Sequence, residues 1–293
     1  MPDVSQLLAR AESLVAKLEK LLPGEPVPVD WKAAIAFRWR KVNGANGRGA
    51  LHPVPQVHRI DIKALVGIDE QKSLVEQNTR QFVEGHPANN VLLTGARGTG
   101  KSSLIKALLN KYAPRGLRLI EVEKQDLIDL PDIVEMICQR PERFVLYCDD
   151  LSFEADEPGY KALKVILDGS VAAASENCLI YATSNRRHLM PEFMNENLEY
   201  KHVGEEIHPG ETSEEKVSLS ERFGLWVSFY PFDQDEYLDI VAKWLTYFKV
   251  SGANTEDVRH AALQWALQRG SRSGRIAWQF ARDWAGRTRS ARS

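Results

Sequence analysis

The amino-acid sequence predicts an α/β fold: a parallel five-stranded sheet covered by helices on both faces, followed by a small all-helical domain. Two observations carry this prediction. Apolar strand patterns alternate with helical patterns over residues 56–230, and continuous apolar strands separated by helices are typical of a parallel sheet buried on both faces. Over residues 231–293 the pattern is helical only, with turn residues between the segments.

Residues 1–55 are expected to form an N-terminal helical extension and a linker. Leucine and alanine at helical spacing predict an amphipathic helix over 4–22, which the Pro-Gly-Glu-Pro run at 23–26 ends. A second apolar segment covers 31–39, and a loop rich in glycine and asparagine follows at 43–49. We therefore place the boundary of the extension near residue 55.

The elements of the core and of the last domain follow in chain order. Pro131 suits the first turn of a short helix. The expected strands are 91–94, 117–122, 144–148, 178–183 and 225–230. The expected helices of the core are 102–112, 131–139 and 157–175, and those of the last domain are 233–250, 255–269 and 273–285.

Composition limits the classes of function. The 293 residues are 43% hydrophobic and 27% charged, with a net charge of −2, whereas a protein that binds duplex nucleic acid usually has a clear basic excess. Three cysteines in apolar stretches predict reduced, buried thiols rather than disulfides. The N-terminus lacks the pattern of a signal peptide, and no apolar run is long enough to span a bilayer. We expect a cytoplasmic protein.

The segment after the first expected strand matches the pattern G-x-x-x-x-G-K-[ST]. Glycines let backbone N–H groups surround phosphate oxygens, the lysine reaches the β- and γ-phosphates, and the serine hydroxyl binds Mg²⁺. A strand precedes the segment and a helix follows it, as this chemistry requires. The residues are Gly95, Ala96, Arg97, Gly98, Thr99, Gly100, Lys101 and Ser102.

Two carboxylates end the third expected strand. Asp149 is the candidate Mg²⁺ ligand together with Ser102, since both offer the hard oxygen atoms that this cation prefers. Asp150 is then placed to polarise an attacking water. Glu154 is a second, lower-ranked candidate for that base. The alternative is that adjacent acids merely cap the next loop.

Three further residues have a functional and a plainer interpretation each. Asn185, at the end of the fourth strand, either holds water against the γ-phosphate or serves as a turn residue. Arg222 either enters the site of a neighbouring subunit or forms a surface ion pair. Arg275 opens the last helix and is either a phosphate contact or an exposed helical charge.

The order of these motifs resembles the AAA+ ATPases over residues 60–285. In that resemblance Val66, Gly67 and Ile68 lie beside adenine, Gly95 to Ser103 form Walker A, and Asp149 and Asp150 form Walker B. Asn185 is similar to sensor 1, Arg222 to the arginine finger and Arg275 to sensor 2. Local similarity extends to the Holliday-junction branch-migration motor and to replication initiators. The overall pattern is most similar to an uncharacterised bacterial AAA+ family, a domain of unknown function.

The resemblance implies a three-layer P-loop NTPase core with sheet order 5-1-4-3-2 and a helical lid over bound ATP or ADP. It also implies a homo-oligomeric ring or arc, with a hexamer favoured. Three features depart from the pattern. Asp150 stands where glutamate is usual, residues 123–131 lack a pore loop, and no DNA-binding domain follows the lid.

The first functional hypothesis is therefore a Mg²⁺-dependent, oligomeric ATPase that remodels an unknown protein or nucleic-acid partner. Catalysis would depend on Lys101, Asp150, Asn185 and Arg222. The alternatives are a slowly hydrolysing nucleotide switch that recruits a partner and, further, a DNA-processing motor or loader. The aromatic and basic run at 37–41 could stack bases, but packing against the core is favoured because the run is short.

Overall fold

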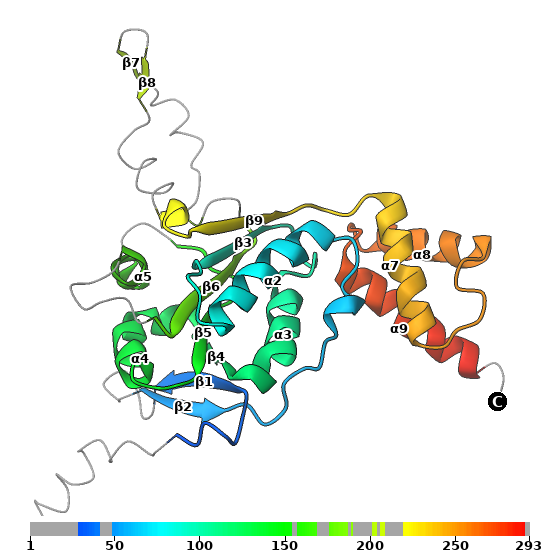
Figure 1. Cartoon of the computed structure of the whole chain (residues 1–293). Coiled ribbons are helices and arrows are strands. Elements are labelled where there is room, and N and C mark those ends of the chain that lie inside the picture. The colour runs from blue at the N-terminus through cyan, green and yellow to red at the C-terminus, as the bar shows by residue number, and fades with distance from the viewer. Residues whose placement is uncertain are drawn as a thin grey trace, which may run out of the picture.

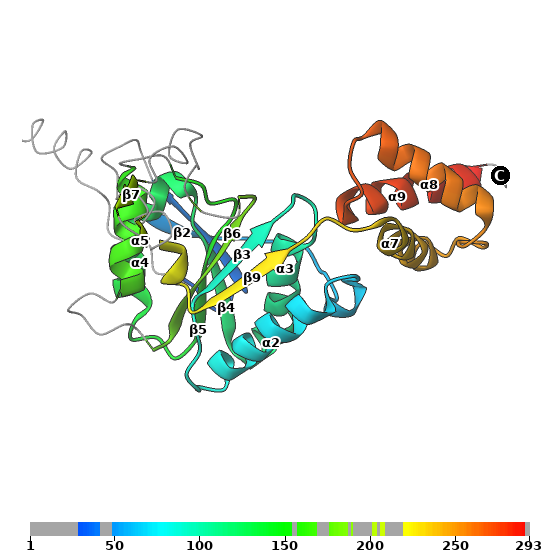
Figure 2. The same cartoon turned by 90° about the horizontal axis from the view of Figure 1, so that it is seen from above.

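The computed structural model of the chain describes residues 29–41, 49–153, 157–168, 176–186, 189, 201–203, 206–208 and 219–290. The expected helix over 4–22, the end of the expected helix 157–175, and Glu154 lie outside these residues. Within them, a sheet flanked by helices forms the core, and three helices form a smaller unit beside it (Figures 1 and 2).

The sheet has seven strands in the order β2-β1-β4-β5-β6-β3-β9. The five expected strands have the expected order, and each pairs with its neighbours in parallel. They are β3 (Val91–Gly95), β4 (Leu117–Glu121), β5 (Arg143–Cys148), β6 (Cys178–Ser184) and β9 (Leu225–Phe229).

Two further strands extend the sheet at its edge, so the expectation of five strands was too low. β1 (Ala36–Lys41) pairs in parallel with β4, and β2 (Gly49–Pro53) pairs antiparallel with β1. Both precede the boundary that the sequence places near residue 55. Phe37 is 0% and Trp39 is 2% exposed, which confirms that the aromatic residues of this segment pack in the core.

Helices cover both faces of the sheet. One core, containing Leu93 and Val145, packs against α2 and α3 and continues into the C-terminal helices. The other, containing Leu92 and Leu146, packs against α4 and α5. The bounds are α2 (Asp69–Val83), α3 (Lys101–Tyr112), α4 (Leu130–Ile137) and α5 (Pro158–Asp168). α2 was not expected from the sequence.

The C-terminal unit, here called the lid, consists of α7 (Gln234–Tyr247), α8 (Glu256–Gln268) and α9 (Gly274–Ser290). α7 begins with a capping box in which Asp233 and Glu236 each accept a hydrogen bond from the other's backbone N–H. Three short 3₁₀ helices, η1 (Ile62–Ala64), η2 (Ala113–Arg115) and η3 (Lys124–Asp129), and a small hairpin of β7 (Lys201–Val203) and β8 (Glu206–His208) complete the described elements. In the part of the chain that the structure describes, no helix has both the length and the apolar character to cross a membrane.

Candidate functional site

The loop between β3 and α3 owes its shape to three glycines in left-handed conformations. Gly95, Gly98 and Gly100 have φ angles of 120°, 76° and 105°, which residues with a side chain rarely adopt. A Cβ on Gly95 would also lie 1.9 Å from the carbonyl oxygen of Phe229. The loop ends at the N-terminus of α3, where free N–H groups and the helix dipole favour an anion.

The Lys101 side chain lies inside this loop. Its ammonium donates hydrogen bonds to the carbonyl oxygens of Gly95 (2.6 Å) and Ala96 (2.7 Å) and to Oδ1 of Asn185 (3.1 Å). Burial lowers the pKa of Lys101, and the nearby carboxylates of Asp150 and Asp149 oppose that shift. The residue is only 6% exposed, so the fold holds a positive charge beneath the phosphate-binding loop.

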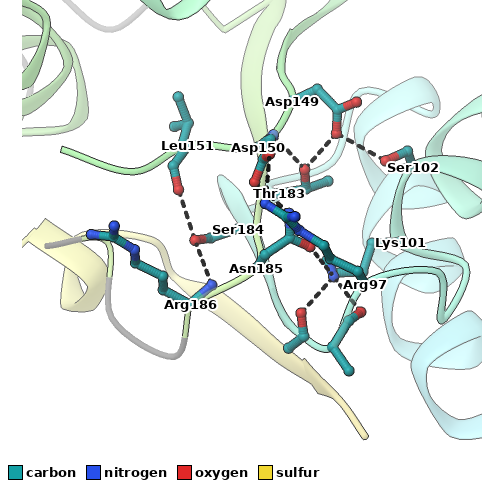
Figure 3. Close-up of polar contacts among 12 residues, drawn as sticks. Arg97, Lys101, Ser102, Asp149, Asp150, Leu151, Thr183, Ser184, Asn185 and Arg186 are labelled. Atoms are coloured by element: carbon teal, nitrogen blue, oxygen red, sulfur yellow. Dashed lines mark hydrogen bonds and ion pairs between the residues drawn. The ribbon is translucent and has the colours of Figure 1, made fainter. Parts of the chain in front are cut away.

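Ser102 and Asp149 form the next layer of the site (Figure 3). Ser102 Oγ donates to Asp149 Oδ1 at 2.8 Å, and Thr183 Oγ1 donates to the same oxygen at 2.6 Å. Burial by itself would raise the pKa of Asp149, but hydrogen bonds from Thr183 and Ser102 bring it below its ordinary value. The pair therefore offers an ionised carboxylate and a hydroxyl side by side, a donor set suited to Mg²⁺.

Asp150 points toward the same space from a left-handed backbone conformation with φ 53°. Its carboxylate accepts a hydrogen bond from Asn185 Nδ2 at 2.5 Å and lies 3.9 Å from the Arg97 guanidinium. Its own N–H donates to Thr183 Oγ1 at 2.9 Å. Asp150, Asn185 and Lys101 thus form one connected polar network across the ends of β5, β6 and β3 (Figure 3).

A cavity of about 580 Å³ joins this network to the lid. Residues 97–103, Asp149, Asp150, Thr183 and Asn185 line its polar end. The other end is largely apolar and is formed by residues before α2 and by the lid. Its lining residues are His58, Ile60, Ala64, Leu65, Val66, Ile68, Phe232, Ile240, Trp244 and Trp278.

The lid contacts the phosphate-binding loop directly. The Arg275 N–H donates to the Gly98 carbonyl oxygen at 3.4 Å, and the Arg275 side chain lines the cavity. A Cβ on Gly98 would lie 2.8 Å from Ser273 Oγ. Gly67, with φ 74°, packs against the ring of Phe232 and does not itself line the cavity. A change in lid position would therefore change the shape of the cavity.

Arg222 lies elsewhere. It precedes β9, whose far end, Phe229, pairs with Gly95, so Arg222 is at the end of the sheet opposite to the loop. Its guanidinium pairs with the Asp168 carboxylate at the end of α5. The structure therefore does not bring Arg222 into the cavity of its own chain.

The other described residues that the sequence predicts for the site lie at or beside the cavity. Gly95 and Ala96 contribute carbonyl oxygens to Lys101 and do not line the cavity, whereas Arg97 to Ser103 do. Sequence reasoning missed Thr183 as a bridge between the two aspartates, and it missed the aromatic walls Trp244 and Trp278. Trp278 lies one helical turn after Arg275, and that spacing is a signal that was present in the sequence.

The fold of this chain, a mostly parallel sheet followed by C-terminal helices, is AAA+-like. Over 78% of the chain the structure matches RuvB from Thermotoga maritima, the Holliday junction branch migration motor, with a TM-score of 0.52 and 13% identity for a lysine-to-arginine mutant. The chain spans 65% of the length of that protein. A replication initiator, DnaA bound to AMPPCP and single-stranded DNA, matches 71% of the chain and 59% of its own length at 18% identity, with a TM-score of 0.46.

The chain belongs to the family described as "Protein of unknown function (DUF815)", whose model matches residues 32–288. Among curated proteins, a proteasome-associated ATPase from Mycobacteroides abscessus is 32% identical over 121 residues. That alignment covers 39% of this chain and 20% of the relative. The matched family residues begin before β1, in accord with the place of β1 and β2 in the sheet.

Proposed function

We propose that this chain binds ATP with Mg²⁺ in the cavity between core and lid and hydrolyses it in an assembly of copies, remodelling a macromolecular partner. One observation carries the proposal. A single cavity joins a buried lysine, a glycine loop at a helix N-terminus and a hydroxyl–carboxylate pair to an apolar, aromatic wall. The polar end suits a triphosphate, and the apolar end suits a base.

The chain's residues divide the work of binding between them. Lys101 and the loop N–H groups hold the phosphates, and Arg275 reaches them from the lid. Ser102 Oγ and Asp149 would hold Mg²⁺, since their oxygens lie 2.8 Å apart and Asp149 is kept ionised. Bound there, the metal would neutralise charge on the phosphate oxygens.

Hydrolysis would use the Asp150–Asn185 pair. The Asp150 carboxylate accepts the proton of the attacking water as the water oxygen bonds to the γ-phosphorus and the bond to the ADP oxygen breaks. Asn185 orients that carboxylate through its Nδ2 hydrogen bond. Arg222, which faces away from its own cavity, would neutralise charge in the site of a neighbouring copy.

A second candidate function is a slowly hydrolysing nucleotide switch. The Asn185 hydrogen bond and the nearby Arg97 guanidinium both stabilise the ionised form of Asp150, which makes its carboxylate a weaker base toward water. In that case the nucleotide-bound lid position, rather than turnover, would recruit the partner.

The first test is the ATPase rate per subunit measured against protein concentration, for the wild type and for Arg222→Ala. A composite site gives a rate that rises with concentration and falls by about 10³-fold or more in the variant. Fluorescent ATP-analogue binding should be equal in both proteins, because Arg222 does not line its own cavity. A low ATPase rate that depends neither on protein concentration nor on Arg222 would favour the nucleotide switch.

A further inference from the structure

The lid carries a basic and aromatic groove that the proposed nucleotide chemistry does not use. The groove has a volume of about 990 Å³ and lies between α8 and α9. We call it the lid groove. Its lining residues are Trp265, Arg269, Trp278, Gln279, Arg282, Asp283, Gly286 and Arg287.

Two of the three arginines that line the lid groove can bind an anion without breaking an ion pair to a described residue. Arg287 pairs with Asp283 at 2.8 Å. Arg269 and Arg282 form no ion pair with any residue that the structure describes. Three arginines and one acidic residue line the groove. A surface with this imbalance attracts acidic partners and repels basic ones.

The geometry of the aromatic residues favours an acidic polypeptide over a nucleic acid. The Arg269 guanidinium lies 3.5 Å from the centre of the Trp265 ring, and Arg282 lies over Trp278 at 5.3 Å. Each arginine lies over one face of its ring, so less of each ring is open for a base to stack on. Their guanidinium groups remain able to bind carboxylates in pairs of hydrogen bonds.

The same chain contains a segment of complementary charge. Residues 190–218 hold eight glutamates against two lysines. Leu189 and Leu219, which flank this segment, are buried in the core that packs on α4 and α5. The lid continues the core on the other face of the sheet, and β7–β8 lies at the end of the molecule away from the lid in both views (Figures 1 and 2).

We propose that the lid groove binds the glutamate-rich segment 190–218 of a neighbouring copy of this chain. A contact between two different surfaces of identical copies is heterologous, and repeated copies then close into a ring or extend as an arc. The inference deepens the proposed assembly of copies and names the surfaces that join them.

The groove also adjoins the nucleotide cavity. Trp278 lines both spaces, and Arg275 lies one turn before it on α9. An acidic segment bound in the groove would fix this side chain, and a nucleotide bound in the cavity would do the same from the other side. Binding at either place should therefore strengthen binding at the other, because such coupling is reciprocal.

A charge-swap experiment on the full chain tests the proposal. One variant carries Arg269→Glu and Arg282→Glu, and the other carries Glu214→Arg and Glu215→Arg. Sedimentation velocity with a non-hydrolysed ATP analogue should show assembly weakened by about tenfold or more in each variant alone, because like charges then face each other. An equimolar mixture of the two should recover assembly, because each variant's groove then meets an opposite charge on the other.

Arg259→Glu is the matched control, since Arg259 lies on α8 outside the groove, and it should assemble like the wild type. Each variant should bind a fluorescent ATP analogue, which separates this inference from the nucleotide site. Wild-type-like assembly of both variants, or a mixture that does not recover, would overturn the proposal. So would binding of a 20-nucleotide oligodeoxythymidine that the groove variant loses while its assembly is unchanged, since that result assigns the groove to nucleic acid.

Discussion

At the scale of single residues, Lys101 stabilises the phosphate-binding loop and also provides a positive charge for a phosphate. Its ammonium satisfies two loop carbonyls and the Asn185 side chain, and it stays close to the place where phosphate would bind. Burial lowers its pKa, and an anionic ligand would reverse this shift. The cost of burying the charge is therefore offset when the nucleotide binds.

Lys101→Ala should abolish tight nucleotide binding. Loss of a buried, charged donor should weaken affinity by about 100-fold or more, as measured by titration with a fluorescent ATP analogue. Lys111→Ala is the control on the same helix, because Lys111 forms an ion pair with Glu76 outside the cavity. Equal affinity in the two variants would refute the role of Lys101.

Asp150→Asn should keep nucleotide affinity and lose turnover. Asparagine has nearly the same shape and tolerates the left-handed conformation that Asp150 adopts at φ 53°, so the backbone should stay in place. It cannot accept a proton from water. Single-turnover hydrolysis and analogue binding, measured side by side, separate the two effects. Normal hydrolysis by the variant would show that a residue other than Asp150 is the general base.

At the scale of elements, β1 shows where sequence reasoning reached its limit. The order of the five central strands and the polar residues after them follow from local patterns that the sequence displays. The pairing of β1 with β4 joins Phe37 to Ile120, which lie far apart in the chain, and no local pattern encodes that contact. The same applies to Trp244, whose place in the cavity depends on how the lid packs.

Trp39→Ala should destabilise the whole core and not merely an appendage. Trp39 is 2% exposed and its Nε1 donates to Asp129 Oδ2 at 2.9 Å. Removing a buried tryptophan costs about 3–5 kcal/mol of unfolding free energy, measurable by urea unfolding. Arg40→Ala, an exposed position on the same strand, should change stability little. An unfolding curve unaltered by Trp39→Ala would show that β1 is dispensable.

At the scale of the whole molecule, the ion pair of Arg222 with Asp168 would link a chain's own site to the site of a neighbouring copy in the proposed assembly. Asp168 ends α5, which follows the segment that carries Asp149 and Asp150. Helix α5 thus lies between the two aspartates of a chain's own site and Arg222, the residue that would act in the site of a neighbouring copy. We regard Asp168 as a positioning residue for Arg222.

Asp168→Ala should lower turnover several-fold at saturating ATP while leaving nucleotide affinity unchanged. The reason is that Arg222 would lose its orienting partner without any change in the chain's own cavity. Asp168→Asn should retain part of the rate, because an amide oxygen still accepts a hydrogen bond from the guanidinium. Steady-state kinetics against ATP concentration give kcat and KM separately, and an effect confined to KM would contradict the assignment.

Strand β9 connects the sheet of the core directly to the first helix of the lid. Residues 225–229 are paired with β3 along their length, Arg222 stands just before them, and α7 starts after only the four residues 230–233. A movement of the lid would therefore change the backbone at residues 230–233, next to the end of β9. A nucleotide that moves the lid would therefore act on β9, and through this strand on Arg222 at its other end.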